Sequence, residues 1–486
     1  MDFGNSLALT APELILSVSG LILLIIAAWG GDKSARLISI LSVTAIFAAS
    51  AVTLDFFTNE AFEFGGDAFG GLYRMDYLSS FTKLLIFAAG IISLIVAPRF
   101  FGKMGGMRSE YPILIVFATV GMSMMVSSVN LMTLYIGLEL NSLASYVLAS
   151  MLRNDTRSAE AGLKYFVLGA LASGILLFGM SLLYGFTGST DFAAISEALT
   201  GDLSQSKGAL IGVVFILAGL AFKISAVPFH MWTPDVYEGA PTPVTAFFAS
   251  APKVAALALT MRVVLDAFGN QVGAWQQIII FVALASIILG AFGAIGQSNI
   301  KRLLAFSSIN NVGFILVGLA AATAQGVSGM LVYLTIYLAM TLGAFVCVME
   351  MRDKEGRQLE NLDSLAGLST SRPGLSAAFA IFMFSLAGIP PLFGFWGKFL
   401  VFDAAVAAGL LPLAVIGIAA SVIGAFYYLK VVKIMYFDEA ADVILPQGGK
   451  TEMTVIALMA LMVSPLGYFA LPILAPAAEA AASVLF

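Results

Sequence analysis

The sequence predicts an all-α, polytopic membrane protein of about 14 transmembrane helices. Of its 486 residues, 60% are hydrophobic and only 11% are charged, and the mean hydropathy is +0.98. A soluble globular domain carries about 25% charged residues, so this composition excludes a soluble class. The apolar runs are continuous and do not alternate with polar residues, which favours membrane helices over a β-barrel.

Each apolar run reaches about 20 residues, the length that crosses a bilayer as a helix. The runs occupy residues 12–30, 36–57, 77–97, 111–128, 130–150, 160–186, 209–229, 243–267, 275–296, 302–322, 326–349, 374–409 (broken), 411–436 and 452–474. We expect no cleavable signal peptide, because the first run has an acidic flank and continues without a small-residue cleavage site.

Lysine and arginine residues gather in alternate loops, and this asymmetry predicts the orientation. One set of loops carries Lys33, Arg36, Arg99, Lys103, Arg108, Arg153, Arg157, Lys301, Arg302, Arg352, Lys354, Arg357, Arg372, Lys430, Lys433 and Lys450. The other set carries Arg74 and Lys207, has Lys83 and Arg262 nearby, and is acidic, with Glu60, Glu63, Asp67, Asp191, Glu197 and Asp202. We therefore place the basic loops in the cytoplasm and both termini on the periplasmic side of a bacterial inner membrane. The mitochondrial inner membrane is the alternative location.

Five charged residues interrupt the apolar runs: Glu139, Lys164, Lys223, Lys253 and Lys398. A charge at the bilayer centre costs roughly 2.5–3.5 kcal/mol on insertion scales, so such residues indicate function by default. Glu139 lies about nine residues into its run, roughly 14 Å deep and near the midplane. A glutamate kept neutral by burial is its structural alternative. Lys164 lies about five residues into its run, where snorkelling to the cytoplasmic interface explains it equally well.

Prolines break two of the runs close to these lysines. Lys223 lies five residues before Pro228, and Lys398 follows the pair Pro390–Pro391. A proline kinks or ends a helix, and irregular backbone at membrane depth is tolerated only inside protein or along a cavity. Lys253 also follows a proline and lies about ten residues into its run. Buried lysines release their proton readily, which suits a proton relay, whereas simple pairing with a carboxylate is the alternative.

The segment after the first break adds polar candidates. His230 is either a proton relay, since the ordinary pKa of histidine is about 6.5, or the cap of a broken helix. The stretch Trp232–Pro243 reads as a polar, turn-rich loop, and we expect Asp235 and Glu238 to be interfacial.

The two breaks lie at comparable positions, near 218–232 and 387–396, about five helices apart. Interrupted helices at matching places in two halves predict inverted repeats. We divide the chain into a three-helix segment (1–110), a first repeat (111–267), a second repeat (268–437) and a C-terminal helix (438–486).

Other chemistry finds little support in the sequence. One cysteine, Cys347, excludes an internal disulfide and a clustered-cysteine metal or iron–sulfur site. One histidine leaves no pair for haem ligation, and no glycine-rich loop predicts a nucleotide site.

Three stretches carry a resemblance to a known family. They are Leu138-Glu139-Leu, the segment from Phe222-Lys223 through Val227-Pro-Phe-His-Met-Trp-Thr-Pro-Asp-Val-Tyr-Glu-Gly-Ala-Pro-Thr-Pro243, and Gly388-Ile-Pro-Pro with Lys398. Over about residues 75–440 the chain resembles the antiporter-like membrane subunits of respiratory complex I, the proton-pumping NADH:quinone oxidoreductase. By its helix count and by its residues Lys253 and Lys398, the chain is most similar to the N-type subunit, the mitochondrial subunit 2 type.

The resemblance implies roles for the matching residues. Glu139 and Lys164 correspond to an ion pair whose opening and closing modulates Lys223, the central proton-loading lysine. Lys253 corresponds to the connecting residue, and Lys398 to the terminal lysine beside the periplasmic exit. At about 8 Å and an effective dielectric near 20, a freed Lys164 would repel a charged Lys223 by roughly 2 kcal/mol, more than one pKa unit.

The resemblance also implies partners and cofactors. The chain would be a non-redox subunit of a translocase and bind no cofactor, while NADH, FMN, iron–sulfur clusters and quinone belong to partner subunits. Neighbouring M-type and K-type subunits are the expected contacts. Two alternatives remain open: a subunit of a multi-subunit cation/proton antiporter, and a structural scaffold that merely contains buried ion pairs.

Overall fold

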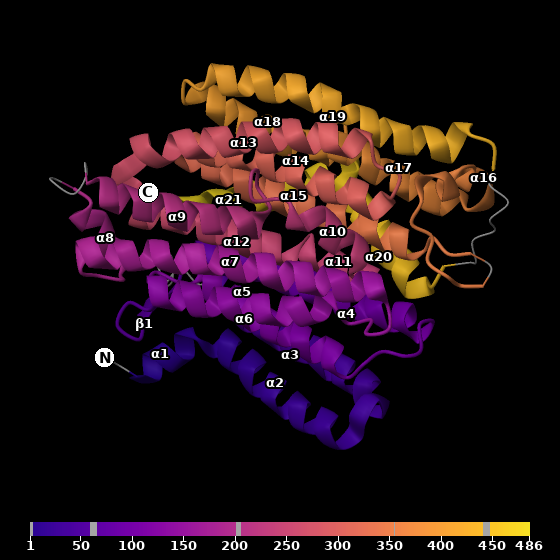
Figure 1. Cartoon of the computed structure of the whole chain (residues 1–486), viewed down its shortest axis with the longest axis horizontal. Coiled ribbons are helices and arrows are strands. Elements are labelled where there is room, and N and C mark those ends of the chain that lie inside the picture. The colour runs from indigo at the N-terminus through magenta and orange to yellow at the C-terminus, as the bar shows by residue number, and fades with distance from the viewer. Residues whose placement is uncertain (1–2, 59–65, 201–205, 354, 441–447) are drawn as a thin grey trace.

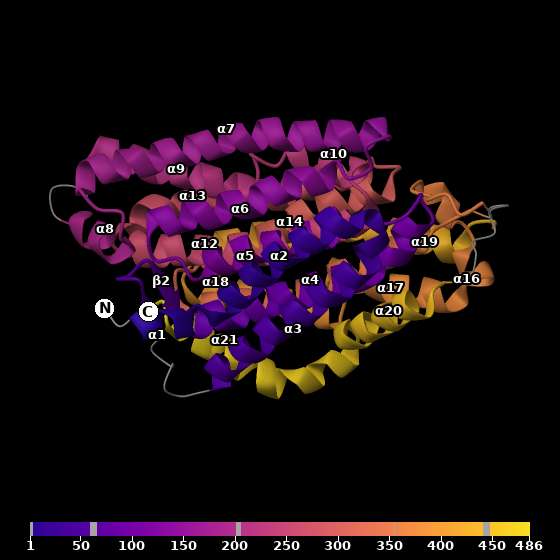
Figure 2. The ribbon, with the colours of Figure 1, turned by 90° about the horizontal axis from the view of Figure 1, so that it is seen from below.

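The computed structural model describes residues 3–58, 66–200, 206–353, 355–440 and 448–486, in which long helices lie side by side along one common direction (Figures 1 and 2). Eleven stretches of these residues are long and apolar enough to cross a membrane, and one of them, Ala11–Thr58, contains two helices. The predicted all-α membrane class is confirmed. The charged residues Glu60, Glu63, Asp202 and Lys354 lie outside the described residues.

The elements follow one another in a simple order along the chain. The α-helices are α1 (Phe3–Leu9), α2 (Ala11–Gly30), α3 (Ala35–Thr58), α4 (Tyr77–Gly102), α5 (Glu110–Val126), α6 (Leu131–Ala149), α7 (Thr156–Thr187), α8 (Phe192–Ala198), α9 (Lys207–Ile224), α10 (Trp232–Gly239), α11 (Thr242–Phe248), α12 (Ala251–Arg262), α13 (Val272–Ile295), α14 (Ile300–Ala320), α15 (Ala324–Met349), α16 (Leu368–Ser371), α17 (Pro373–Ala387), α18 (Phe393–Ala407), α19 (Leu411–Phe437), α20 (Lys450–Val463) and α21 (Leu471–Ser483). Short turns of helix are η1 (Gly31–Ser34), η4 (Val263–Ala267), η5 (Gly269–Gln271), η6 (Leu362–Leu365) and η7 (Pro465–Ala470). One antiparallel hairpin pairs β1 (Gly66–Ala68) with β2 (Tyr73–Met75).

The helices follow the predicted runs except at three prolines. The predicted loop 232–243 is wrong, because helix α10 forms there; Pro234 lies in its first turn, where a missing N–H breaks no helical hydrogen bond. The run 243–267 is divided into α11 and α12, with Pro252 at the second position of α12. The last run is divided as well, since α20 ends before Pro465 and α21 begins after the η7 turn.

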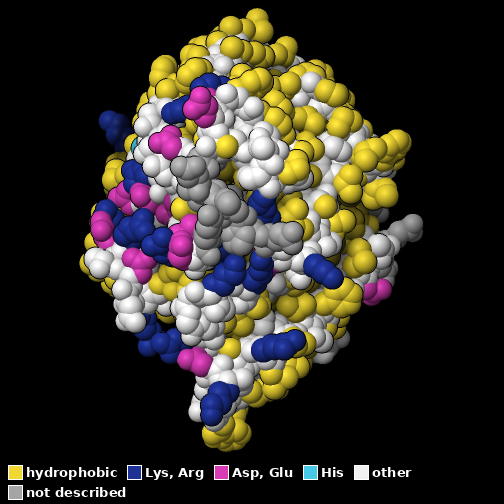
Figure 3. Space-filling model, turned by 90° about the vertical axis from the view of Figure 1, so that its right-hand side faces the viewer, with side chains coloured by type: hydrophobic (Ala, Val, Ile, Leu, Met, Phe, Trp, Pro, Cys, Tyr) yellow, Lys and Arg dark blue, Asp and Glu magenta, His cyan; other side chains and the backbone are white. Residues whose placement is uncertain are grey.

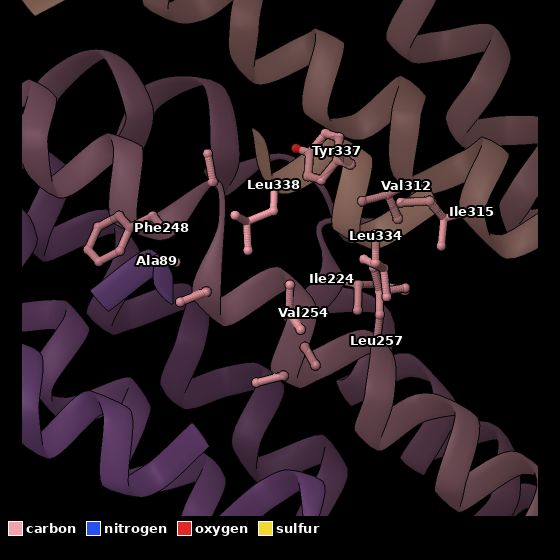
Figure 4. Close-up of a cluster of buried hydrophobic side chains, with 14 of the residues drawn as sticks. Ala89, Ile224, Phe248, Val254, Leu257, Val312, Ile315, Leu334, Tyr337 and Leu338 are labelled. Carbon is pink, nitrogen blue, oxygen red and sulfur yellow. The ribbon is translucent and has the colours of Figure 1, made fainter. Parts of the chain in front are cut away.

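The centre of the bundle is formed by α11–α12, α14 and α15. Between 94% and 100% of the residues in the most apolar part of these helices are buried, against 17% for the α2–α3 stretch. Figure 4 shows apolar side chains from α9, α12, α14 and α15 meeting in this core: Ile224, Val254, Leu257, Val312, Ile315, Leu334 and Leu338. The charged residues predicted from the sequence are therefore arranged around a tightly packed apolar centre.

The two ends of the bundle differ in charge. Both termini lie at one end, and the α2–α3, α4–α5 and α6–α7 connections lie at the other (Figure 1). Figure 3 shows Lys and Arg side chains gathered at this second end, which we call the basic end. The predicted grouping of the basic loops on one side is therefore present in the fold.

Close packing of α5 on α6 depends on two glycines. A Cβ on Gly121 would lie 2.5 Å from the backbone N of Asn141, and a Cβ on Gly137 would lie 2.9 Å from the carbonyl O of Gly121. Small residues let membrane helices approach closely. This contact fixes the rotation of α6, and Glu139, two residues beyond Gly137, then lies on the side away from α5.

A buried ion pair that sequence analysis did not single out joins α2 to α4. Lys83 Nζ lies 2.7 Å from Glu13 Oε1, and the two side chains are 0% and 9% exposed. Lys83 also donates to the Tyr73 hydroxyl at 2.6 Å, and that hydroxyl donates to Glu13 Oε2 at 2.9 Å. Ser123 of α5 donates to the same carboxylate. The β2 strand supplies Tyr73, so the hairpin helps to fix α2 to the bundle.

A second buried ion pair fixes the start of α4 to the core. Arg262, the last residue of α12, donates through Nη2 to both carboxylate oxygens of Asp76 at 2.8 Å. Its Nε donates to the carbonyl of Val126 at 3.2 Å. Asp76 also caps α4 by accepting from the backbone N–H of Ser79. The two pairs together attach the outer helices α2, α4 and α5 to the buried α12.

We predict that Glu13→Gln lowers the thermal unfolding midpoint of the protein, because Lys83 remains buried without a carboxylate. Breaking one partner of a buried ion pair is destabilising by about 3–5 kcal/mol. The double variant Glu13→Gln/Lys83→Met should recover most of the loss, since it removes both charges. Thermal unfolding in detergent measures both variants, and equal midpoints for Glu13→Gln and the parent would contradict the prediction.

Candidate functional site

The first break separates α9 from α10, and a lysine binds the carbonyl that the break leaves free. Helix α9 ends at Ile224, and Ser225 takes the left-handed conformation with φ 62°. Lys253 Nζ donates to the carbonyl of Ile224 at 2.8 Å, and the Lys253 side chain is buried. The indole Nε1 of Trp232 donates to the carbonyl of Phe222 at 3.0 Å. The end of the half-helix is thus capped by side chains from α10 and α12.

Lys223 projects from the last turn of α9 toward α6. Its Nζ donates to Ser142 Oγ at 2.7 Å and lies 5.8 Å from the centre of the Tyr146 ring. Ile224, whose carbonyl holds Lys253, is the next residue along the chain. Lys223 and the carbonyl that binds Lys253 therefore both belong to the end of α9.

The second break separates α17 from α18 and has the same arrangement. Helix α17 ends at Ala387, and Gly388 takes the left-handed conformation with φ 82°. Lys398 Nζ donates to the carbonyl of Ala387 at 3.0 Å and to Ser421 Oγ at 3.2 Å. It also lies 4.4 Å from the centre of the Phe314 ring.

In both breaks a lysine ammonium therefore binds the last carbonyl of a half-helix. The carbonyl end of a helix carries a partial negative charge, and free carbonyls at membrane depth bind cations in transporters. Among the ion pairs of the described residues, none involves Lys223, Lys253 or Lys398. The alternative of simple pairing with a carboxylate does not hold for these three lysines in this structure.

Glu139 lies on α6 and faces α7. Asn130 caps α6 by accepting from the backbone N–H of Met132, which sets the start of the helix. The carboxylate of Glu139 accepts a hydrogen bond from Ser173, whose Oγ also lies 3.1 Å from the Tyr135 hydroxyl and can accept from it. The acid is thus hydrogen-bonded by a neutral hydroxyl.

The sequence matches known proteins along the whole length of the chain. Residues 128–424 match the family described as NADH:quinone oxidoreductase/Mrp antiporter, TM. The chain is 60% identical over 486 residues to NADH-quinone oxidoreductase subunit N of Erythrobacter litoralis, covering 100% of this chain and 99% of that protein. It is 62% identical over 488 residues to the subunit N of Rhizorhabdus wittichii, covering both chains fully. The chain belongs to the NADH-quinone oxidoreductase subunit N family.

Solved structures agree with this assignment. A chain of respiratory complex I from Thermus thermophilus with bound aureothin has a TM-score of 0.80 and 29% identity, covering 95% of this chain and 99% of that chain. A chain of the Mrp complex from Dietzia sp. has a TM-score of 0.84 at 21% identity, covering 98% and 97%. The second likeness shows a shared fold alone.

The ion pair of Glu139 with Lys164, which the family resemblance implied, is absent from this structure. Lys164 Nζ instead lies 2.7 Å from Asp235 and 2.7 Å from Glu160, and its side chain is 41% exposed. Ser173, which holds Glu139, is nine residues further along α7, about 14 Å of helix rise. Lys164 therefore extends toward the basic end in this conformation, as the snorkelling interpretation described.

Lys164 lines a cavity of about 230 Å³ at the basic end. Arg302 Nη1 lies 2.6 Å from Asp235 and 3.0 Å from Glu238, so the acidic residues of α10 bind both cations. Asp235 and Glu238 are partly exposed, in agreement with their predicted interfacial position.

His230 lies half-buried in the segment between α9 and α10. Within the described part of the chain, no hydrogen bond or ion pair connects its side chain to Glu139 or to the four lysines. Its predicted role as a relay stays a prediction.

A polar network beside Lys398 was missed by sequence analysis. Tyr333 packs against Gly397, where a Cβ would lie 2.7 Å from its ring, and donates to Asn311 Oδ1 at 2.8 Å. Asn311 Nδ2 donates to the Tyr428 hydroxyl at 3.2 Å, and that hydroxyl hydrogen-bonds Ser307. Neutral residues in an apolar helix give little signal by themselves. Their spacing at 307 and 311, one turn apart on α14, was the available sign.

We predict that Gly388→Ala destabilises the protein and displaces Lys398. The position has φ 82°, and a Cβ there would lie 2.9 Å from Lys398 Cδ, so both backbone and side chain must adjust. We expect a loss of about 1–3 kcal/mol. The matched control is Gly374→Ala near the start of α17, where a Cβ has open space. Thermal unfolding midpoints in detergent compare the two variants. Equal losses of stability for Gly388→Ala and Gly374→Ala would contradict the prediction.

Proposed function

We propose that this chain is a proton-translocating membrane subunit of an NADH:quinone oxidoreductase. The observation that carries the proposal is the matched pair of broken helices, each with a lysine on its last carbonyl, in a chain of the subunit N family. A lysine held by a neutral carbonyl gains or loses a proton without leaving a buried carboxylate unpaired. Such groups suit charge relay inside a membrane.

The relay begins at the first break. Lys223 takes a proton and passes it to Lys253, because Lys223 lies in the last turn of α9 next to Ile224, whose carbonyl accepts from Lys253. Ser142 stabilises the charged form of Lys223 as an acceptor. Lys398 is the last member, and the Tyr333–Asn311 network beside it offers hydroxyl and amide groups for onward transfer. The chain thus has two proton-binding sites under this proposal, Lys223 with Lys253 at the first break and Lys398 at the second.

Lys164 supplies the control of this relay. In the described conformation Asp235 and Glu160 hold its charge at the basic end, away from Lys223. When Lys164 leaves Asp235 and pairs with Glu139, its charge moves deeper into the membrane, and opening of that pair lets the freed ammonium approach Lys223. At about 8 Å from Lys223 the repulsion is roughly 2 kcal/mol, enough to drive release of a proton.

The chain takes no part in the redox step under this proposal. NADH, FMN, iron–sulfur clusters and quinone belong to partner subunits, with M-type and K-type membrane subunits as neighbours and the whole complex acting as the translocase. The basic end faces the cytoplasm of a bacterial inner membrane and both termini face the periplasm, as the distribution of Lys and Arg favours. Residues 111–267 and 268–437 are the two inverted repeats, each with one broken helix.

A multi-subunit cation/proton antiporter is the second candidate, because a chain of an Mrp complex shares the fold. Sodium-dependent transport and the absence of co-purifying flavin and iron–sulfur subunits would favour it. Identity of 60% over the whole chain to an oxidoreductase subunit, against 21% to the Mrp chain, supports the first candidate.

We predict that Lys223→Ala and Glu139→Ala each lower NADH-driven proton pumping about tenfold or more, since each removes a charge from the relay. Lys223→Arg should also fail, because it keeps the positive charge but does not release its proton. A pH-sensitive dye in inverted membrane vesicles measures pumping. Lys207→Ala, at the other end of the same helix, is the matched control.

A scaffold role predicts a different outcome for these variants. It requires Lys223→Arg to pump normally, and it requires Lys223→Ala to reduce the amount of assembled complex rather than its turnover. Normal pumping by an assembled complex with either Lys223 variant would refute the relay.

We predict that Asp235→Asn lowers proton pumping about fivefold, because Lys164 loses a partly exposed partner worth about 1 kcal/mol and its positions at the basic end and near Glu139 are no longer balanced. Glu160→Gln is the control, since Glu160 is more exposed and lies on the same helix as Lys164. The same vesicle assay applies, and a larger effect of Glu160→Gln would speak against this role for Asp235.

A further inference from the structure

A second, larger cavity opens at the basic end and plays no part in the relay. Its volume is about 1640 Å³, and it is lined by the α2–α3 turn, the ends of α3 and α4, the α4–α5 and α6–α7 connections and the loop after α15. Small-molecule sites measure roughly 300–1,000 Å³. The cavity is therefore larger than a free anion or a nucleotide-sized ligand requires.

The cavity is strongly positive. Seven basic residues line it (Lys33, Arg36, Lys103, Arg108, Arg153, Arg157 and Arg357) against three acidic residues (Asp32, Asp155 and Glu355), a net charge of four positive. Arg108, Arg153, Arg157 and Arg357 each lie within 4 Å of a carboxylate. No ion pair of the described residues involves Lys33, Arg36 or Lys103. These three cations are available to an anion.

The surroundings of Lys103 support this reading. Lys103 lies just past the end of α4, and partial burial together with the like charges of Arg352 and Arg99 lowers its pKa below the ordinary value. A positive charge held among other positive charges gains from an added anion.

The lower wall of the same cavity is apolar and continues along the membrane-facing helices. Ile40 and Val43 of α3 and Leu94, Ile95 and Pro98 of α4 form this part of the lining. The wall extends to Thr44, nine residues into α3 and about 14 Å of helix rise from its first residue. Ile40 is 56% and Ile95 40% exposed, so this groove is open to the bilayer.

We propose that this cavity binds an anionic glycerophospholipid, with its phosphate on Lys33, Arg36 and Lys103 and an acyl chain in the α3–α4 groove. Basic pockets between helices on the cytoplasmic side bind anionic headgroups. The positive rim above an apolar groove matches the two halves of such a lipid. The site is formed by η1, the start of α3 and the end of α4 with the residue that follows it, and it does not include any residue of the relay.

The test uses the intact, detergent-purified membrane complex, depleted of lipid and titrated with phosphatidylglycerol or phosphatidylcholine under native mass spectrometry. At about 1 kcal/mol for each basic residue, Lys33→Gln/Lys103→Gln should weaken phosphatidylglycerol binding about thirtyfold. Phosphatidylcholine binding should stay unchanged. Lys430→Gln/Lys433→Gln on α19 removes the same charge outside the cavity and should have less than about a twofold effect.

A second pair of variants tests the acyl groove with the charges intact. Val43→Trp fills the groove, and Ile40→Trp does so from a more exposed position that is less demanding for folding. Both should weaken phosphatidylglycerol binding, while millimolar inorganic phosphate should not displace the lipid. The thermal unfolding midpoint checks that each variant is folded.

Three results would overturn the proposal. One is equal phosphatidylglycerol binding by Lys33→Gln/Lys103→Gln and the α19 control. Another is displacement of the lipid by inorganic phosphate with no effect of either tryptophan, which would indicate a free-anion site. The third is a segment of a neighbouring subunit in the cavity, detected by cross-linking from Lys103.

Discussion

The bond between a lysine ammonium and the last carbonyl of an interrupted helix is the interaction on which the rest of this structure depends. A helix that stops inside a membrane leaves carbonyl groups without hydrogen-bond donors, and an isolated ammonium there lacks acceptors. Each defect is unfavourable alone, and together they satisfy one another. Lys253 does this for Ile224 and Lys398 does it for Ala387. The breaks exist because prolines impose them, and the lysines make them tolerable.

The surrounding packing keeps these bonds in place. Helices α12, α14 and α15 are almost wholly buried, so Lys253 and the contact of Lys398 with Phe314 are positioned by a rigid core. The buried pairs of Glu13 with Lys83 and of Asp76 with Arg262 attach the outer helices to that core. Charge is thus used in two ways, as ion pairs that hold helices together and as single lysines bonded to neutral acceptors.

Much of this was predictable from sequence because its signals are local. Long apolar runs gave the helices, prolines gave the breaks, and an interrupted run marked each of Glu139, Lys223, Lys253 and Lys398. The partners were not predictable, because they come from distant segments: Lys253 binds a residue 29 positions away. Lys164 illustrates the limit, since nothing near it in the sequence distinguishes Asp235 from Glu139. The loop expected at 232–243 became α10 because a proline in a first helical turn does not break it.

The space between the two breaks bears on coupling under the proposed relay. Apolar side chains of α9, α12, α14 and α15 pack together in the cluster of Figure 4, which includes Ile224, Val254 and Leu334. Helices α14 and α15 also carry hydrogen-bonded polar pairs, Tyr333 with Asn311 and Tyr337 with Ser308. No hydrogen bond or ion pair of the described residues joins Lys253 to Lys398 directly, so a proton passes between them only through other polar groups or water. A proton pump requires an interruption of this kind, because a continuous proton path would let the proton gradient collapse. A movement of charge, such as that of Lys164, must therefore accompany each proton transfer across the interruption.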